Sequence, residues 1–230
     1  MERFSQASVL AIVGLNAADL RQIAIYVICL VIAVSVHEFA HAFAADRLGD
    51  PTPSREGRLT LNPVSHADPI GTLALPVMAG LFHLPLLGWG RPVPTQPSHY
   101  TRRISMRAGL ALVAFAGPLS NLLQAVLTLV VLKVLVVSGV SSRGLAEILL
   151  TFFQLNLILF AFNLLPLHPL DGGKILAWLL PPKLSYIDDF FARWGGLILL
   201  VLVILLPEVL GAMLAPILSL TQWSLRLLGL

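Results

Sequence analysis

The chain has 230 residues, of which 57% are hydrophobic and only 12% charged, and its mean hydropathy is +0.87. This composition excludes an ordinary soluble domain, in which about a quarter of the residues are charged, and favours an all-α protein that crosses a membrane several times. The net charge of +3 does not indicate nucleic-acid binding, because the basic residues gather at the ends of apolar runs, where they set orientation in the membrane.

The first full membrane span is expected over residues 20–45, which at about 1.5 Å per residue is long enough to cross a bilayer. Residues 8–15 before it form a short apolar run. We expect an amphipathic segment at the membrane interface there, with a cleaved signal peptide as the alternative. Cys29 in the first span is the only cysteine, which excludes an intramolecular disulfide and a cysteine-based zinc site.

A His-Glu-x-x-His pattern lies near the end of this span, at His37, Glu38 and His41. Residues four apart share a helix face, so the two histidines project side by side and can hold one metal ion, with Glu38 next to it. Three ionisable residues within a span are costly and indicate function. By itself the pattern also fits two helix-face histidines beside a solvated glutamate, but its position favours a metal site embedded in the membrane.

Polarity rises after the first span, and the loop that follows carries Arg47, Arg55 and Arg58. Positively charged loops are retained on the cytoplasmic side, so we place this loop, and the end of the span that bears His41, in the cytoplasm.

Residues 70–88 are apolar over almost the length of a span, but proline, glycine and histidine interrupt them. A single crossing would put the arginine-rich loop that follows outside the cell, against the positive-inside tendency. We therefore expect a re-entrant region over about 57–94, which enters the membrane and returns. A fifth ordinary span is the alternative.

Two further core spans are expected over about 108–137 and 145–167, followed by C-terminal helices over about 190–230. The tail over 210–230 could span the membrane or lie flat on it. No internal repeat or separate soluble domain is visible, so residues 1–230 are interpreted as one domain.

A hydrolytic zinc site keeps three protein ligands and one open position for water, so two histidines need a third donor. Asp171 is the best candidate, because it follows a returning span on the same face of the membrane as His41 and is flanked by glycines. As alternatives, Asp171 could cap a short helix that starts at Gly172, or His168 could be the third ligand. The remaining histidines are expected at the interface: His66, His83 and His99.

In this arrangement Glu38 would take a proton from the water that attacks a carbonyl group and pass it to the leaving amine. Amide side chains are neutral donors that suit an oxyanion in a site of low dielectric constant, and Asn121 and Asn163 fit that role. Hydrogen bonding between helices is an equally good reading of both asparagines.

Three sequence motifs together resemble the site-2 protease family of intramembrane zinc metalloproteases (peptidase family M50), in its compact prokaryotic form without PDZ or CBS domains. The motifs are, in order, 37–41 (His-Glu-Phe-Ala-His), 117–121 (Gly-Pro-Leu-Ser-Asn), and 163–166 (Asn-Leu-Leu-Pro) leading to 170–173 (Leu-Asp-Gly-Gly). They cover the chain from about residue 23 to residue 174. His168 departs from the family, many members of which have proline there.

The resemblance implies one zinc ion per chain, bound by His37, His41 and Asp171, with Glu38 as the catalytic residue and with support from Asn163 and Asn121. It also implies a multi-pass protein of the prokaryotic cytoplasmic membrane. Its substrate would be a transmembrane helix of another membrane protein, cut close to the cytoplasmic face. The ligand set also suits other divalent metals.

A helical substrate must unwind before its peptide bond can be attacked, and an exposed strand edge could hold the unwound segment. We expect residues 57–61 or 89–93 to provide that edge, so that proline at Thr60 or Val93 would impair cleavage and spare metal binding. Two alternative functions are a membrane metallohydrolase of a non-peptide amphiphile and a non-catalytic metal-binding membrane protein. Glu38 argues against the latter, since metal binding alone does not require it.

Overall fold

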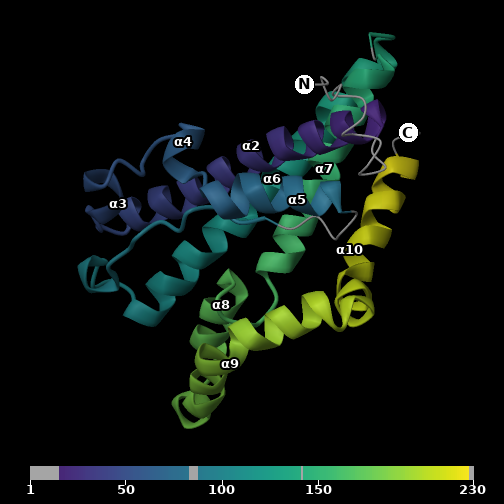
Figure 1. The fold of residues 1–230 in the computed structure, drawn as a ribbon. Helices are drawn as coiled ribbons and strands as arrows, with labels where there is room; N and C mark the ends of the chain where they lie inside the picture. The colour runs from purple at the N-terminus through teal and green to yellow at the C-terminus, as the bar shows by residue number, and fades with distance from the viewer. Residues whose placement is uncertain (1–15, 83–87, 141, 228–230) are drawn as a thin grey trace, which may run out of the picture.

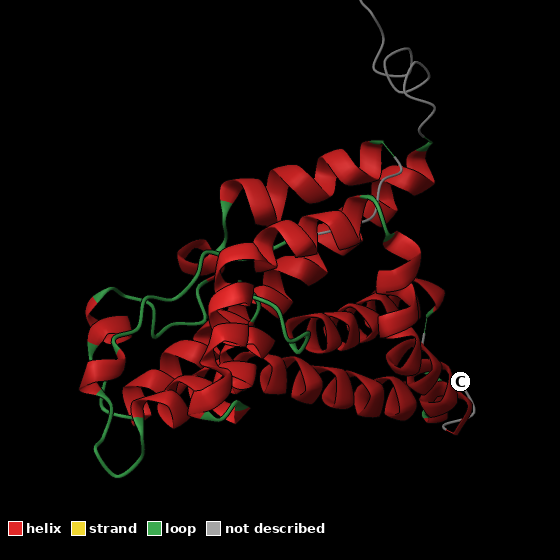
Figure 2. Ribbon diagram, turned by 90° about the horizontal axis from the view of Figure 1, so that it is seen from below, coloured by secondary structure: helices red, strands yellow, loops and turns green. Residues whose placement is uncertain are grey.

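The computed structural model describes residues 16–82, 88–140 and 142–227. Within these ranges the chain is helical, and its one β pairing is an isolated antiparallel bridge between Ala67 and Gly90. The predicted all-α architecture is confirmed (Figure 1, Figure 2). The sequence interpretation of residues 8–15, and that of His83, lie outside the described residues. The helices are α2 (Ala17–Arg47), α3 (Thr52–Arg55), α4 (Pro63–His66), η1 (Pro69–Ala74), α5 (Leu75–Leu81), η2 (Pro97–His99), α6 (Met106–Val137), α7 (Arg143–Asn163), α8 (Asp171–Leu179), η3 (Pro182–Leu184), α9 (Ser185–Ile204) and α10 (Pro207–Leu227).

Three helices, α2, α6 and α7, are long and apolar enough to cross a membrane, as the sequence predicts. Each begins at a polar side chain that accepts hydrogen bonds from the first free backbone N–H groups: Asn16, Ser105 and Ser142, respectively. Helix α2 ends where Gly49 adopts a φ of +100°, a conformation that glycine reaches without steric cost.

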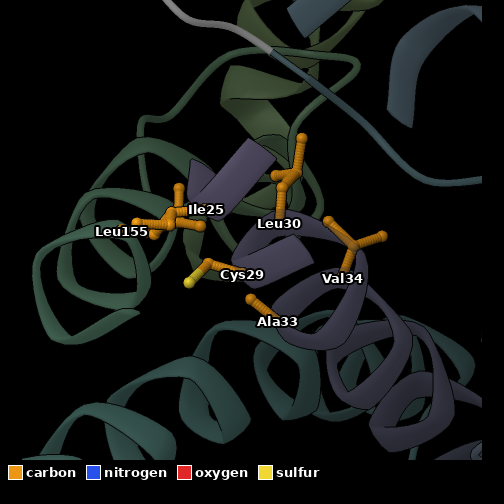
Figure 3. Close-up of a cluster of buried hydrophobic side chains, with 6 residues drawn as sticks. All are labelled: Ile25, Cys29, Leu30, Ala33, Val34 and Leu155. Carbon is orange, nitrogen blue, oxygen red and sulfur yellow. The ribbon is translucent and has the colours of Figure 1, made fainter. Parts of the chain in front are cut away.

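Helix α2 packs against both α6 and α7. Figure 3 shows one cluster of its buried side chains. This cluster consists of Ile25, Cys29, Leu30, Ala33 and Val34 from α2 and Leu155 from α7. Ala33, Ala42 and Ala45 have no exposed surface, and such small residues let neighbouring helices approach closely.

The outward face of α6 carries large apolar side chains at helical spacing, each more than half exposed: Leu123, Leu127, Val130 and Val134. A stripe of this size is unfavourable in water, whereas lipid tails solvate it without cost. The exposed stripe thus supports the interpretation of α6 as a membrane span.

Residues 69–81 run beside α2, and residues 88–93 come back past the start of this stretch. The first of these stretches is a six-residue π-helix, η1, followed directly by the seven residues of α5. Together they are about 20 Å long, too short for a hydrocarbon core of about 30 Å. The backbone N–H of Trp89 then donates to Gly71 O at 3.2 Å, so the returning chain lies beside the outgoing one. The described helical part of this segment is therefore shorter than a span, and its re-entrant course through a membrane stays a prediction.

The prediction of a strand edge at residues 57–61 is wrong. Gly57 adopts a φ of +66° within a turn, and Arg58 points inward, where its side chain donates to the carbonyl group of Ser65. His66 is fully buried instead of interfacial, and its Nε2 donates to the carbonyl oxygen of Thr60 at 2.7 Å. The segment is thus a turn followed by a bend and not an extended strand.

The C-terminal helices α9 and α10 meet at a sharp bend of 90°, visible in Figure 1. Helix α9 begins near α8. A Cβ atom at Gly195 would lie 2.2 Å from His168 O, so only glycine permits this contact. Ile217 and Leu225 of α10 pack against a buried cluster that contains Phe153 of α7. Helix α10 therefore lies against the bundle.

Candidate metal centre and active site

Two histidines from α2 and one aspartate from α8 converge on a single point. His37 Nε2 and His41 Nε2 are 3.0 Å apart, and Asp171 Oδ2 lies 3.3 Å from the first and 3.1 Å from the second. Tetrahedral zinc with bonds of about 2.0–2.2 Å separates neighbouring donors by about 3.4 Å. The three atoms thus nearly form one face of such a tetrahedron, and the donor set fits zinc.

The other nitrogen of each imidazole is already engaged. His41 Nδ1 lies 2.7 Å from the carbonyl oxygen of Val113, which can only accept, so Nδ1 carries the proton and Nε2 keeps its lone pair. His37 Nδ1 lies 2.6 Å from Asn121 Oδ1. Contacts of this kind at the distal nitrogen orient histidine ligands in metal sites.

Gly117 on α6 leaves the space into which both imidazoles project. A Cβ atom there would lie 2.4 Å from His41 Nε2 and 2.6 Å from His37 Nε2. Any side chain at this position would occupy the space between the backbone of α6 and the two Nε2 atoms. Asn121 lies one helical turn further along the same face, so one turn of α6 both leaves room for the ligands and orients one of them.

Asp171 is the first residue of α8 and does not cap it: Leu170 precedes the helix, and no side-chain cap is formed. Its Oδ2 faces the histidines, while Lys174 Nζ holds Oδ1 at 3.2 Å. The close approach needs Gly172, where a Cβ atom would lie 2.2 Å from Leu165 O. With Oδ1 paired to an ammonium group, Asp171 offers one oxygen, which leaves a fourth position open.

Glu38 lies beside the ligands and lines the same cavity. Its Oε2 accepts a hydrogen bond from the backbone N–H of Val93 at 3.2 Å. The returning segment 88–93 therefore crosses α2 directly at Glu38. A Cβ atom at Gly90 would lie 2.4 Å from a methyl group of Val34, so this close crossing depends on glycine.

Asp50 holds the continuation of this segment at the end of α2. Its buried carboxylate accepts hydrogen bonds from Thr52, from the backbone N–H of Gln96 and from His99 Nδ1. Burial by itself would raise the pKa of Asp50, but these hydrogen bonds favour the charged form and hold the pKa below its ordinary value.

The two asparagines predicted as oxyanion donors occupy different environments. Asn163 lines the cavity, although its Nδ2 donates to Leu159 O in its own helix at 3.0 Å. Asn121 is fully buried, with Oδ1 at His37 and Nδ2 donating to Asn156 Oδ1 at 2.9 Å. Both ends of this amide are engaged, so its position favours a supporting role at His37.

The rival third ligand, His168, faces away from the centre, and its Nε2 pairs with Asp188 Oδ1 on α9 at 3.0 Å. His99 is partly exposed and pairs with Asp50. Sequence reasoning did not identify Lys174, Gly117 or Asn156 as parts of the site. The available signals were the i, i+3 spacing of Lys174 from Asp171 and the one-turn spacing of Gly117 from Asn121.

Curated proteins similar to this chain are named as metalloproteases. The "Putative zinc metalloprotease YwhC" of Bacillus subtilis is 40% identical over 183 residues, which cover 76% of this chain and 78% of the relative. The "Putative zinc metalloprotease Rip2" of Mycolicibacterium smegmatis is 35% identical over 175 residues, which cover 75% of this chain and 63% of that longer relative. No protein-family model matches the chain, and no solved structure does.

Proposed function

The chain belongs to the zinc metalloprotease family that includes YwhC, and from this premise we propose that it is an intramembrane zinc endopeptidase of the site-2 protease type. Its substrates would be transmembrane segments of other membrane proteins, cut near the cytoplasmic face of the cell membrane.

One observation carries the proposal: a carboxylate suited to general base catalysis shares a cavity with three convergent metal ligands. The cavity has a volume of about 540 Å³. Apart from the ligands, Glu38 and Lys174, its walls are mostly apolar and come from α2, α7, α9 and the segment 88–93, including Val34, Trp89, Leu159, Phe162, Leu199 and Val203. Such walls suit the apolar side chains of a membrane-spanning substrate.

When bound, zinc would supply Lewis acidity, which polarises a peptide carbonyl and lowers the pKa of water to about 7. Glu38 would accept the proton of the attacking water and deliver it to the leaving amine nitrogen. The Val93 N–H, which now binds Oε2, fixes the direction of the carboxylate. Lys174 would keep Asp171 bound through one oxygen while the substrate approaches.

A helical substrate has its carbonyl groups hydrogen-bonded internally, so the cleaved stretch must first be extended. Segment 89–93 lines the cavity beside Glu38 and remains the candidate edge for holding it. The backbone N–H groups of Trp89, Arg91 and Val93 already donate within the protein, to Gly71, His66 and Glu38 respectively. A substrate would therefore pair with the opposite edge, where the peptide groups of Gly90 and the carbonyl group of Pro92 lie, since proline has no N–H to donate.

Arginines near the ends of α2 and α6 support the assignment of the site to the cytoplasmic side. Arg47 ends α2, about 9 Å along the helix axis from His41, and Arg102 and Arg103 precede α6. Positively charged segments near the ends of spans are retained on the cytoplasmic side.

The experiment is co-expression with candidate single-span membrane proteins, in which the wild type is compared with Glu38→Gln. We expect a cleaved product only with the wild type, while both forms retain metal. Equal cleavage by the variant would exclude Glu38 as the general base. Cleavage of a lipid or amphiphile, with no proteolysis of any single-span protein, would favour the alternative metallohydrolase.

A further inference from the structure

Two fully buried amides connect the metal centre to a helix that contributes no ligand. Asn121 of α6 and Asn156 of α7 have no exposed surface, and they link His37 of α2 to the third core helix. Buried polar groups in a membrane span are costly unless satisfied. Here the side-chain oxygen and nitrogen of both asparagines each have a hydrogen-bond partner.

The direction of each hydrogen bond in this series can be worked out from its end at Phe152. The carbonyl group of Phe152 can only accept, so Asn156 donates to it through Nδ2, at 2.9 Å. Asn156 thereby presents Oδ1 to Asn121, which must donate through its own Nδ2, at 2.9 Å. Asn121 is left with Oδ1 facing His37, so the imidazole donates from Nδ1.

We propose that Asn156 is a positioning residue for the metal site, which acts through Asn121 to hold His37 in the tautomer that metal binding requires. With the proton on Nδ1, the lone pair of Nε2 points at His41 Nε2 and Asp171 Oδ2. This role concerns the metal centre alone and does not depend on which substrate is cleaved.

Only one of the two histidines depends on the amide chain, and this provides an internal control. His41 Nδ1 donates directly to Val113 O, a backbone group that no side-chain substitution removes. Without Asn156, the Asn121 amide could turn by half a revolution and present Nδ2 to His37 Nδ1. That arrangement would favour a proton on Nε2, where the metal binds. Loss of such supporting contacts typically weakens metal binding about 10–100-fold.

The test compares Asn156→Leu with Thr128→Val in purified full-length protein. Thr128 is the control, because it is buried in α6, seven residues beyond Asn121, and its Oγ1 donates to the carbonyl group of Gln124, four residues earlier, at 2.6 Å, away from the metal-centre cavity. Zinc affinity is measured by competition with a chromophoric chelator, and histidine tautomers are measured by ¹⁵N NMR of the zinc-free protein.

We expect Asn156→Leu to bind zinc about 10–100-fold more weakly and to lose the Nδ1–H form of His37, while His41 keeps its own. Thr128→Val should match the wild type in both measurements. If Asn156→Leu does not fold, Asn156→Ser replaces it. Serine can bond to Phe152 O, as Ser35 bonds to Val31 O at 2.6 Å, but is too short to orient Asn121. Unchanged zinc affinity with an unchanged His37 tautomer in the folded variant would overturn the proposal.

Discussion

Replacing Gly117 with alanine tests whether both imidazoles face α6 as described. The new Cβ atom would lie 2.4 Å from His41 Nε2, 2.5 Å from His41 Cε1 and 2.6 Å from His37 Nε2. Ordinary contacts between such atoms are about 3.5 Å, so the rings or the helix must move by about 1 Å. Zinc sites tolerate deviations in bond length of only about 0.2 Å.

Because this displacement is about five times the tolerance, we expect Gly117→Ala to weaken zinc binding at least about 100-fold, or about 2.8 kcal/mol. The assay is chelator competition, with circular dichroism to confirm the helical fold. Gly211→Ala is the matched control, since a Cβ atom there meets nothing within 4 Å. Zinc affinity equal to the wild type in Gly117→Ala would refute the described orientation of both histidines.

Three further predictions concern catalysis and stability. Glu38→Gln should keep its zinc and lose about 10²–10⁴-fold in turnover; zinc loss measured by metal analysis would instead make Glu38 a structural residue. Gly195→Ala should be destabilised by about 1–3 kcal/mol through its contact with His168 O, and Gly196→Ala, which meets open space, should not be; equal thermal stability would contradict this. Because the pKa of Asp50 is lowered from its ordinary value of 3.8, its charged form stabilises the fold at pH values above 3.8. Asp50→Asn should therefore lower the free energy of unfolding by about 1–3 kcal/mol at pH 7, and this loss should shrink as the pH falls below 3.8. A loss independent of pH would show that the charge of Asp50 contributes nothing.

The parts of the fold set by local patterns were predictable from the sequence. The helix period places His37 and His41 on one face, and the length of the apolar runs locates α2, α6 and α7. The placement of Asp171 required one further step, in which counting the spans brings residues 37–41 and 171 to the same side of the membrane.

Contacts between segments distant in sequence could not be predicted in this way. Asn121 lies 84 residues from His37, and its two hydrogen bonds are set by how α2, α6 and α7 pack. The inward turn of His66 likewise depends on the backbone of Thr60 and of the returning segment at Arg91. Polar residues in such positions look like interfacial or interhelical residues until their partners are known.

The most direct measurement is a zinc K-edge X-ray absorption spectrum of the purified protein, together with its metal content. We predict one zinc ion per chain, with two imidazole nitrogens and oxygen donors at about 2.0–2.2 Å, and loss of this spectrum in Asp171→Ala. A folded wild-type protein that binds no zinc, or a spectrum unchanged by Asp171→Ala, would contradict the joint binding of one metal ion by His37, His41 and Asp171.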